Sequence, residues 1–250
     1  MERLDNELDQ FINKLRNAEE FKKELKDLKS VYPFNIYEYK IAYLLANKIM
    51  SFSEYLELRT SHIKKNKYLY LFEKASRSFG DTWGLDHLIT IEPSLEKPNK
   101  KIDSSYTGEY DLCLSYSGKI IKIEVKASRM QDRNRRDSLI AKAYYSEFEG
   151  QFQMNFQQLK PSCCDVFIWI VVYRDRIDYW VLKNSVIQKH NDFSPQHRNE
   201  ATKKRSKKYS KSDIYEGQII IKNTNIDSIK DYKVDEKELK EAIIKQYEAE

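Results

Sequence analysis

The chain has 250 residues, of which 40% are hydrophobic, 13% aromatic and 33% charged. This length and apolar content suffice for one large domain or for a domain with an added subdomain, and they argue against a disordered or fibrous protein. The net charge of +5 is a mild excess that by itself only weakly indicates a polyanionic partner. The three cysteines, Cys113, Cys163 and Cys164, match neither a disulfide framework nor the spacing of a zinc site.

The N-terminal stretch MERLDNELDQ is charged from its second residue and lacks the apolar core of a signal peptide. No apolar run approaches the roughly 18 residues of a membrane-spanning helix. The longest run, VFIWIVVY at 166–173, has the length of a strand. We therefore expect a cytoplasmic protein with no membrane partner.

Helical periodicity dominates the first 80 residues. Apolar residues spaced by three or four predict an amphipathic helix over 2–29, with a break, and the same spacing predicts helices over 36–50, from about Ser53, and over 66–79. We interpret residues 1–65 as a helical N-terminal region that serves dimerisation or DNA recognition.

The remaining residues, 66–250, alternate between strand and helix patterns, which predicts an α/β core with a central mixed β-sheet flanked by helices. The expected strands, in chain order, are 87–93, 109–116, 119–126, 165–173, 176–182 and 216–222. The expected helices of this part are 137–160 and 235–249. A long basic loop, 190–213, is the one border at which a subdomain is expected.

The stretch YDLCLSYSGKIIKIEVKAS carries charges in what the pattern predicts to be a hairpin. Its Ser117-Gly118 pair suits a two-residue turn, which places Asp111 directly opposite Glu124. Cβ atoms in such a pair lie about 5 Å apart, and like charges there are destabilising. A divalent cation such as Mg²⁺ would compensate them, because hard cations take carboxylate oxygens. The alternative is an amphipathic strand whose charges simply face solvent.

Asp111, followed after twelve residues by Glu124-Val125-Lys126, resembles the PD-(D/E)xK motif of the restriction-endonuclease-like nuclease superfamily. The chain is most similar in this respect to a type II restriction endonuclease. The resemblance implies that Mg²⁺ is bound by Asp111, by Glu124 and by the main-chain carbonyl of Val125. It also implies that Lys126 orients the attacking water or helps to deprotonate it.

The resemblance covers about residues 66–182 and departs from the motif at Tyr110, where the family pattern has Pro. Many members carry an additional Glu on the helix before the first core strand, and Glu73 stands at that place. An exposed helical Glu beside Lys74 is the alternative. Members also place a polar residue after the ExK strand, for which the candidates are Gln153, Gln157 and Gln158, with an ordinary polar face as the alternative.

Two basic segments are candidates for DNA contact. The first follows the ExK strand and contains Arg129, Arg133, Arg135 and Arg136, which are expected to hold phosphates. The second contains Gln196, His197, Arg198, Lys203, Lys204, Arg205, Lys207 and Lys208. Its first three residues are of types that read base edges, and its cations would neutralise phosphates. A solvated linker is the alternative for this segment.

These features together predict a Mg²⁺-dependent endonuclease that hydrolyses double-stranded DNA at a specific sequence, as a type II restriction enzyme acting as a homodimer. No phosphate-binding loop motif is found, so no nucleotide cofactor is expected. Two alternatives remain open: a structure-specific repair, junction-resolving or transposition nuclease of the same superfamily, and a non-catalytic nucleic-acid-binding protein. A third, less favoured, is an inactive module that binds an acidic protein.

Overall fold

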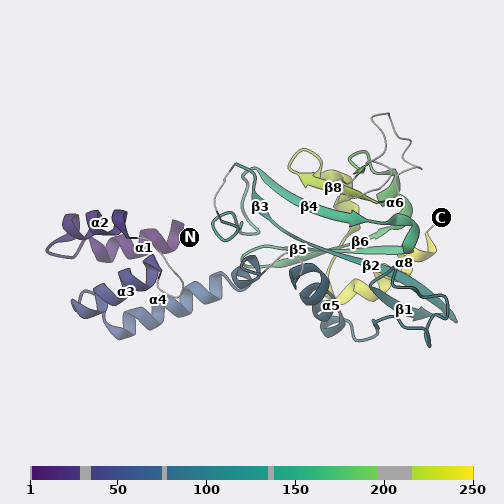
Figure 1. Cartoon of the computed structure of the whole chain (residues 1–250), viewed down its shortest axis with the longest axis horizontal. Helices are drawn as coiled ribbons and strands as arrows, with labels where there is room; N and C mark the ends of the chain where they lie inside the picture. Colours follow the sequence, from purple (N-terminus) through teal and green to yellow (C-terminus); the bar gives the residue numbers. More distant parts are fainter. Residues whose placement is uncertain (1, 29–34, 75–77, 135–137, 196–215, 250) are drawn as a thin grey trace. The chain divides into compact units, whose positions relative to one another are not determined.

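The computed structural model describes residues 2–28, 35–74, 78–134, 138–195 and 216–249 (Figure 1). The chain divides into two compact units, Met1–Lys67 and Tyr68–Glu250. This border lies two residues beyond the one expected from the sequence.

The first unit consists of helices α1 (Glu2–Ile12), α2 (Ala18–Asp27), α3 (Ile36–Ala46) and α4 (Phe52–Lys65). Their apolar faces enclose a small core of its own, which includes Leu8, Ile12, Phe21, Leu44 and Met50. The amphipathic pattern over 2–29 therefore forms two helices, with the break between α1 and α2. A capping box of Ser51 and Glu54 fixes the start of α4.

The second unit is built on a five-stranded sheet. Its strands are β1 (Leu112–Tyr116), β2 (Lys119–Arg129), β5 (Val166–Val172), β6 (Ile177–Lys183) and β9 (Lys233–Val234), in the order β1-β2-β5-β6-β9. Strands β2 and β5 run parallel and the other neighbours antiparallel, so the sheet is mixed. The chain thus has the α/β fold with a central mixed sheet and a helical N-terminal region that the sequence predicts.

A second sheet covers one face of the central sheet (Figure 1). Its strands are β3 (Gln131–Asp132), β4 (Phe152–Leu159), β8 (Gly217–Lys222) and β7 (Ser194–Pro195), in the order β3-β4-β8-β7. The two sheets pack through aromatic residues, among which the rings of Phe156 and Trp169 stack at 3.9 Å. The sequence patterns do not predict this second layer.

Helices cover the opposite face of the central sheet. Leu88 of α5 (Leu85–Ile91) and Ile243 of α8 (Leu239–Glu248) are fully buried in the same core as Ile121 and Ile123 of β2. The shorter elements of this unit are η1 (Leu69–Phe72), the π-helical η2 (Ser78–Gly84), η3 (Pro161–Cys163), α6 (Asn184–Lys189), η5 (Ile226–Tyr232) and η6 (Glu236–Glu238). The buried side chains of β2 thus point alternately toward the helical layer and toward the second sheet.

Three expected elements are wrong. In place of the strand expected over 87–93, a helix forms, since η2 runs directly into α5, which ends at Ile91, and Leu88 of α5 is buried in the core. The helix expected over 66–79 is reduced to the single turn of η1 before residue 75. The helix expected over 137–160 is replaced by turns and then β4, in which Met154 and Phe156 are buried with the period of a strand.

Candidate active site

The site forms at the edge of β2 that faces away from β5. Strand β1 pairs with this edge only up to the pair formed by Leu112 and Ile123. After β2 ends, the chain pairs again at Gln131 of β3, whose partner strand is β4. Among the strands that the structure describes, none pairs with this edge of β2 in between. The neighbouring strands therefore separate beside Glu124, Val125 and Lys126.

Asp111 lies at the start of this opening, directly before β1. Its backbone N–H donates to the Ile123 carbonyl at 3.0 Å, and its carboxylate Oδ2 accepts from the Val125 N–H at 2.8 Å. The N–H and C=O of a strand residue point to the same neighbour, so the Val125 carbonyl is turned toward the same edge. The predicted hairpin register is confirmed from Leu112 to Tyr116, but Asp111 lies one residue beyond the ladder.

Glu124 and Lys126 alternate with Val125 and face the second sheet. Glu124 is only 4% exposed, and its Oε1 lies 2.5 Å from the Lys126 ammonium. Burial raises the pKa of the Glu124 carboxyl to about 7; the Lys126 charge opposes this shift and the Asp111 charge adds to it. The interpretation of these charges as a solvent-facing strand surface is therefore wrong.

The donor atoms are the two carboxylates of Asp111 and Glu124 and the carbonyl of Val125. In the described part of the chain, no group of three His, Cys, Asp or Glu side chains gathers in a way that could hold a metal. Sites that enclose zinc or calcium use more protein ligands than this. Magnesium, in contrast, is usually bound through one or two carboxylates and keeps several waters. The donor set fits a hydrated cation of that kind.

Arg129 does not have the predicted role. It is 5% exposed, and its guanidinium donates to the Leu71 carbonyl at 3.0 Å and to the Lys74 carbonyl at 2.5 Å while lying over the Phe79 ring. The prediction that it contacts phosphate is wrong, because the guanidinium is buried and bonded to the carbonyls of Leu71 and Lys74. Arg133, four residues on, is exposed.

The remaining predicted residues are scattered. Glu73 follows η1 and is exposed. Gln153 and Gln157 lie on the outer face of β4, not on a helix, and Gln158 occupies an irregularity of that strand with a φ of 56°. The other predicted DNA-contacting residues lie outside the described residues: Arg135, Arg136, Gln196, His197, Arg198, Lys203, Lys204, Arg205, Lys207 and Lys208.

Two residues beside Glu124 were not predicted from the sequence. Lys160, at the end of β4, lies near enough for its charge to lower the pKa of Glu124. Cys164 is buried next to the same carboxylate, and burial, reinforced by the Glu124 charge, raises the pKa of its thiol. No sequence pattern marks either residue as part of the site, because each comes close to Glu124 only when β4 and β5 pack beside β2.

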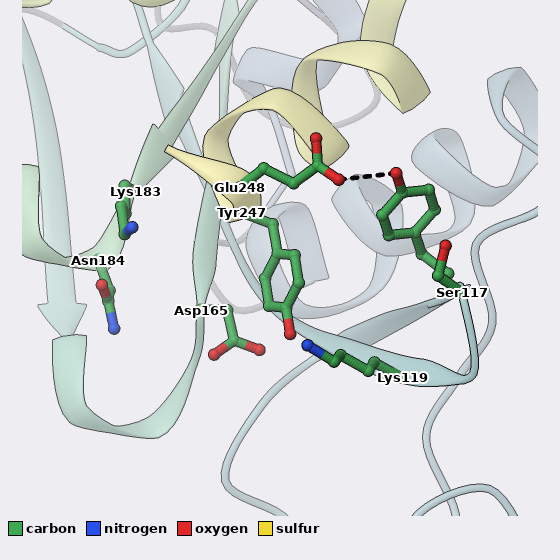
Figure 2. A pocket seen from close by; sticks show the side chains of 8 residues that line it. Ser117, Lys119, Asp165, Lys183, Asn184, Tyr247 and Glu248 are labelled. Carbon is green, nitrogen blue, oxygen red and sulfur yellow. Dashed lines mark hydrogen bonds between the residues drawn. The ribbon is translucent and has the colours of Figure 1, made fainter. Parts of the chain in front are cut away.

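A separate polar pocket of about 540 Å³ lies at the opposite end of β2 (Figure 2). Figure 2 shows the side chains of Lys119, Asp165 and Tyr247 pointing toward one another in it. The Asp165 carboxylate accepts from the Lys122 backbone N–H at 2.9 Å. None of the predicted site residues lines this pocket.

Comparison with models of known protein families finds no match, and a search among curated proteins finds no relative. Within the described ranges, no helix combines the length and the apolar character that crossing a bilayer requires.

Proposed function

We propose that this protein is a Mg²⁺-dependent endonuclease that hydrolyses phosphodiester bonds of double-stranded DNA at a specific sequence, as a type II restriction enzyme of the cytoplasm. The observation that supports it is the buried Glu124–Lys126 ion pair at the open edge of β2, where Asp111 also lies. A carboxylate buried this deeply is costly, and such sites are frequently functional.

The chain's own residues would act in distinct ways. Asp111 and Glu124, with the Val125 carbonyl, would hold the cation, and Asp111 is itself fixed by the Val125 N–H. A bound divalent cation supplies positive charge opposite the phosphoryl oxygens and makes water a better nucleophile at neutral pH. Lys126 would place a further positive charge where negative charge develops and orient the attacking water. Lys160 would add to the positive potential at this edge.

DNA would be bound by backbone contacts near the site, with exposed Arg133 as the described candidate. Specificity for a symmetric sequence suits a homodimer, since two-fold symmetric sites match two-fold symmetric proteins. The helical unit Met1–Lys67 would serve the dimer or the recognition of the sequence.

The test is incubation of plasmid and phage DNA with the full chain and Mg²⁺, followed by sequencing of the ends. Wild type is compared with Glu124→Gln, which keeps the side-chain shape but not the charge, and with Asp86→Asn, an exposed carboxylate on α5. We expect discrete fragments from wild type and Asp86→Asn and none from Glu124→Gln.

The other outcomes separate the alternatives. Cleavage restricted to branched or damaged substrates would replace the restriction enzyme by a structure-specific nuclease with the same site. DNA binding without any metal-dependent cleavage, unchanged in Glu124→Gln, would overturn the proposal in favour of a non-catalytic binding protein.

A further inference from the structure

A cavity of about 240 Å³ with largely aromatic walls lies beyond the end of β2. The residues that line it include Met130, Tyr144, Phe148, Phe152, Tyr173 and Trp180. Pockets for drug-sized ligands are usually larger, about 300–1,000 Å³. This cavity therefore suits one small, flat ring system.

The cavity lies on the same face of the strand as the candidate active site. Side chains alternate along a strand, so Glu124, Lys126, Ser128 and Met130 point to one side, and Met130 is buried in the core between the two sheets. Met130 lies four positions after Lys126, about 13 Å at the usual rise of a strand. That distance corresponds to about four base pairs along a DNA duplex. The cavity therefore lies within about four base pairs of the candidate active site, measured along the strand.

The Phe148 ring in the wall of the cavity is a surface on which a flat ring could stack. The ring of Phe148 stacks on that of Tyr144, with centroids 4.0 Å apart and planes 20° from parallel, while Phe148 stays 50% exposed. The ring lies so close to Gly150 that a Cβ there would come within 1.7 Å of it. The absence of a side chain at Gly150 thus lets Phe148 hold this position. An aromatic ring that is held by a stacked neighbour and stays half exposed can stack a base.

The charges at the cavity favour a nucleotide over a purely apolar ligand. Lys230 of η5 lines the cavity and is exposed, so its ammonium can meet a phosphate. Lys233 lines it too, but its ammonium is already placed by Asp178, at 2.8 Å, and lies over the Trp180 ring. Asp227 offers a carboxylate that can accept from an exocyclic amino group.

We propose that this cavity binds a single nucleobase unstacked from the DNA, with the base stacked on Phe148 and its phosphate near Lys230. The inference rests on the proposed nuclease function for the identity of the ligand. Proteins that take a base out of the stack read it by stacking between aromatic side chains and by hydrogen bonds to its edge. The cavity would therefore contribute to the choice of the cleavage sequence at a position close to the cleaved bond.

Binding can be followed without any cleavage, on the methionine methyl groups. The chain has four methionines, Met1, Met50, Met130 and Met154, and Met130 lines the cavity. The full chain with ¹³C-methyl methionine, free of metal, is titrated with each of the four deoxynucleoside 5′-monophosphates and with deoxyribose 5-phosphate. We expect a saturable shift of the Met130 signal with at least one mononucleotide at millimolar concentration, and none with the sugar phosphate.

Two variants sharpen this test. Phe148→Ala removes the stacking surface at a half-exposed position and is expected to weaken mononucleotide binding by about 5- to 150-fold. Phe148→Trp should retain it, and Phe52→Ala, an exposed aromatic of the other unit, should have no effect. No Met130 shift, an equal shift with deoxyribose 5-phosphate, or unchanged affinity in Phe148→Ala would overturn the inference. Mononucleotide binding in a protein that fails to cut DNA would support this inference while refuting the proposed function.

Discussion

The carboxylate of Asp111 accepts the backbone N–H of Val125 at 2.8 Å, in the place where a further residue of β1 would otherwise bond to β2. The Asp111 side chain therefore accepts a hydrogen bond from β2 at a position where the backbone of β1 no longer pairs with it. The Val125 carbonyl, which points the same way as its N–H, therefore lies at the same edge of β2 as the Asp111 carboxylate. Asp111 thus has a structural role that is independent of any cation, and the two roles can be separated by mutation.

Asp111→Asn keeps an oxygen that can accept from Val125 but removes the negative charge. We expect its free energy of unfolding in urea to stay within about 0.5 kcal/mol of wild type. Asp111→Ala leaves the Val125 N–H without its acceptor and should cost about 1–3 kcal/mol. Both variants should lose Mg²⁺-dependent cleavage of plasmid DNA. Cleavage retained by Asp111→Asn would remove Asp111 from the catalytic set.

Lys126→Met preserves the aliphatic stem of the side chain but deprives Glu124 of the ammonium 2.5 Å away. We expect cleavage to fall by several orders of magnitude while DNA affinity, measured by gel shift, is retained. Stability should fall as well, because one member of a buried pair is left behind.

The double variant Glu124→Gln/Lys126→Met completes a double-mutant cycle for this pair. It should recover part of the stability that Lys126→Met loses, since no unpaired charge remains, but none of the activity. Strictly additive effects on unfolding would show that the two side chains do not interact in solution.

The hairpin of the site could be predicted because its turn and its alternation are local signals. Ser117-Gly118 fixed the register from Leu112 to Tyr116, as the structure confirms. The departure of Asp111 from that ladder could not be predicted, because it depends on where the neighbouring strands separate. The burial of Glu124 depends in the same way on a second sheet whose strands come from distant parts of the chain.

The predicted role of Arg129 is wrong because the strand that contains it is longer than predicted. The strand was expected to end at 126, which made Arg129 part of an irregular basic segment. Strand β2 in fact continues to Arg129, which shares the helix-covered face of the strand with Ile123 and Val125. The run HLITI of α5 is short, apolar and β-branched, and such a run fits a strand or a helix until packing decides. The error at β4 differs: FQMNFQQL alternates apolar and polar residues, as a strand does, but the helix predicted over 137–160 includes it.

His87 of α5 predicts a pH dependence of stability. Its ring stacks between Trp83 and Tyr179, and its Nε2 lies 2.6 Å from the Tyr179 hydroxyl. Burial lowers the pKa of His87, against a smaller opposing effect of Glu236. The unfolded chain therefore binds this proton more readily, so its contribution makes the free energy of unfolding fall as the pH drops below the ordinary value of about 6.5.

His87→Phe keeps a ring in the stack and removes the titration. We expect the urea midpoint of this variant to decline less than that of wild type between about pH 7 and pH 5. The comparison concerns the slope with pH rather than absolute stability, since the Tyr179 hydroxyl loses a partner. Parallel declines in the two proteins would mean that His87 is not buried as a neutral ring.

Arg133 and Arg129 form a matched pair for testing DNA contact, because they are close in sequence but differ in burial. Arg133→Gln should leave the urea unfolding curve unchanged, lower DNA affinity and reduce the slope of log K against log salt by about 0.9, the value for one phosphate. Arg129→Gln should instead cost about 3 kcal/mol of stability, because the carbonyls of Leu71 and Lys74 lose a charged donor. A change of the salt slope in a folded Arg129 variant, or its constancy in Arg133→Gln, would contradict these expectations. The burial of Arg129 makes the first result incompatible with this fold, whereas the second would only move the phosphate contacts to other cations.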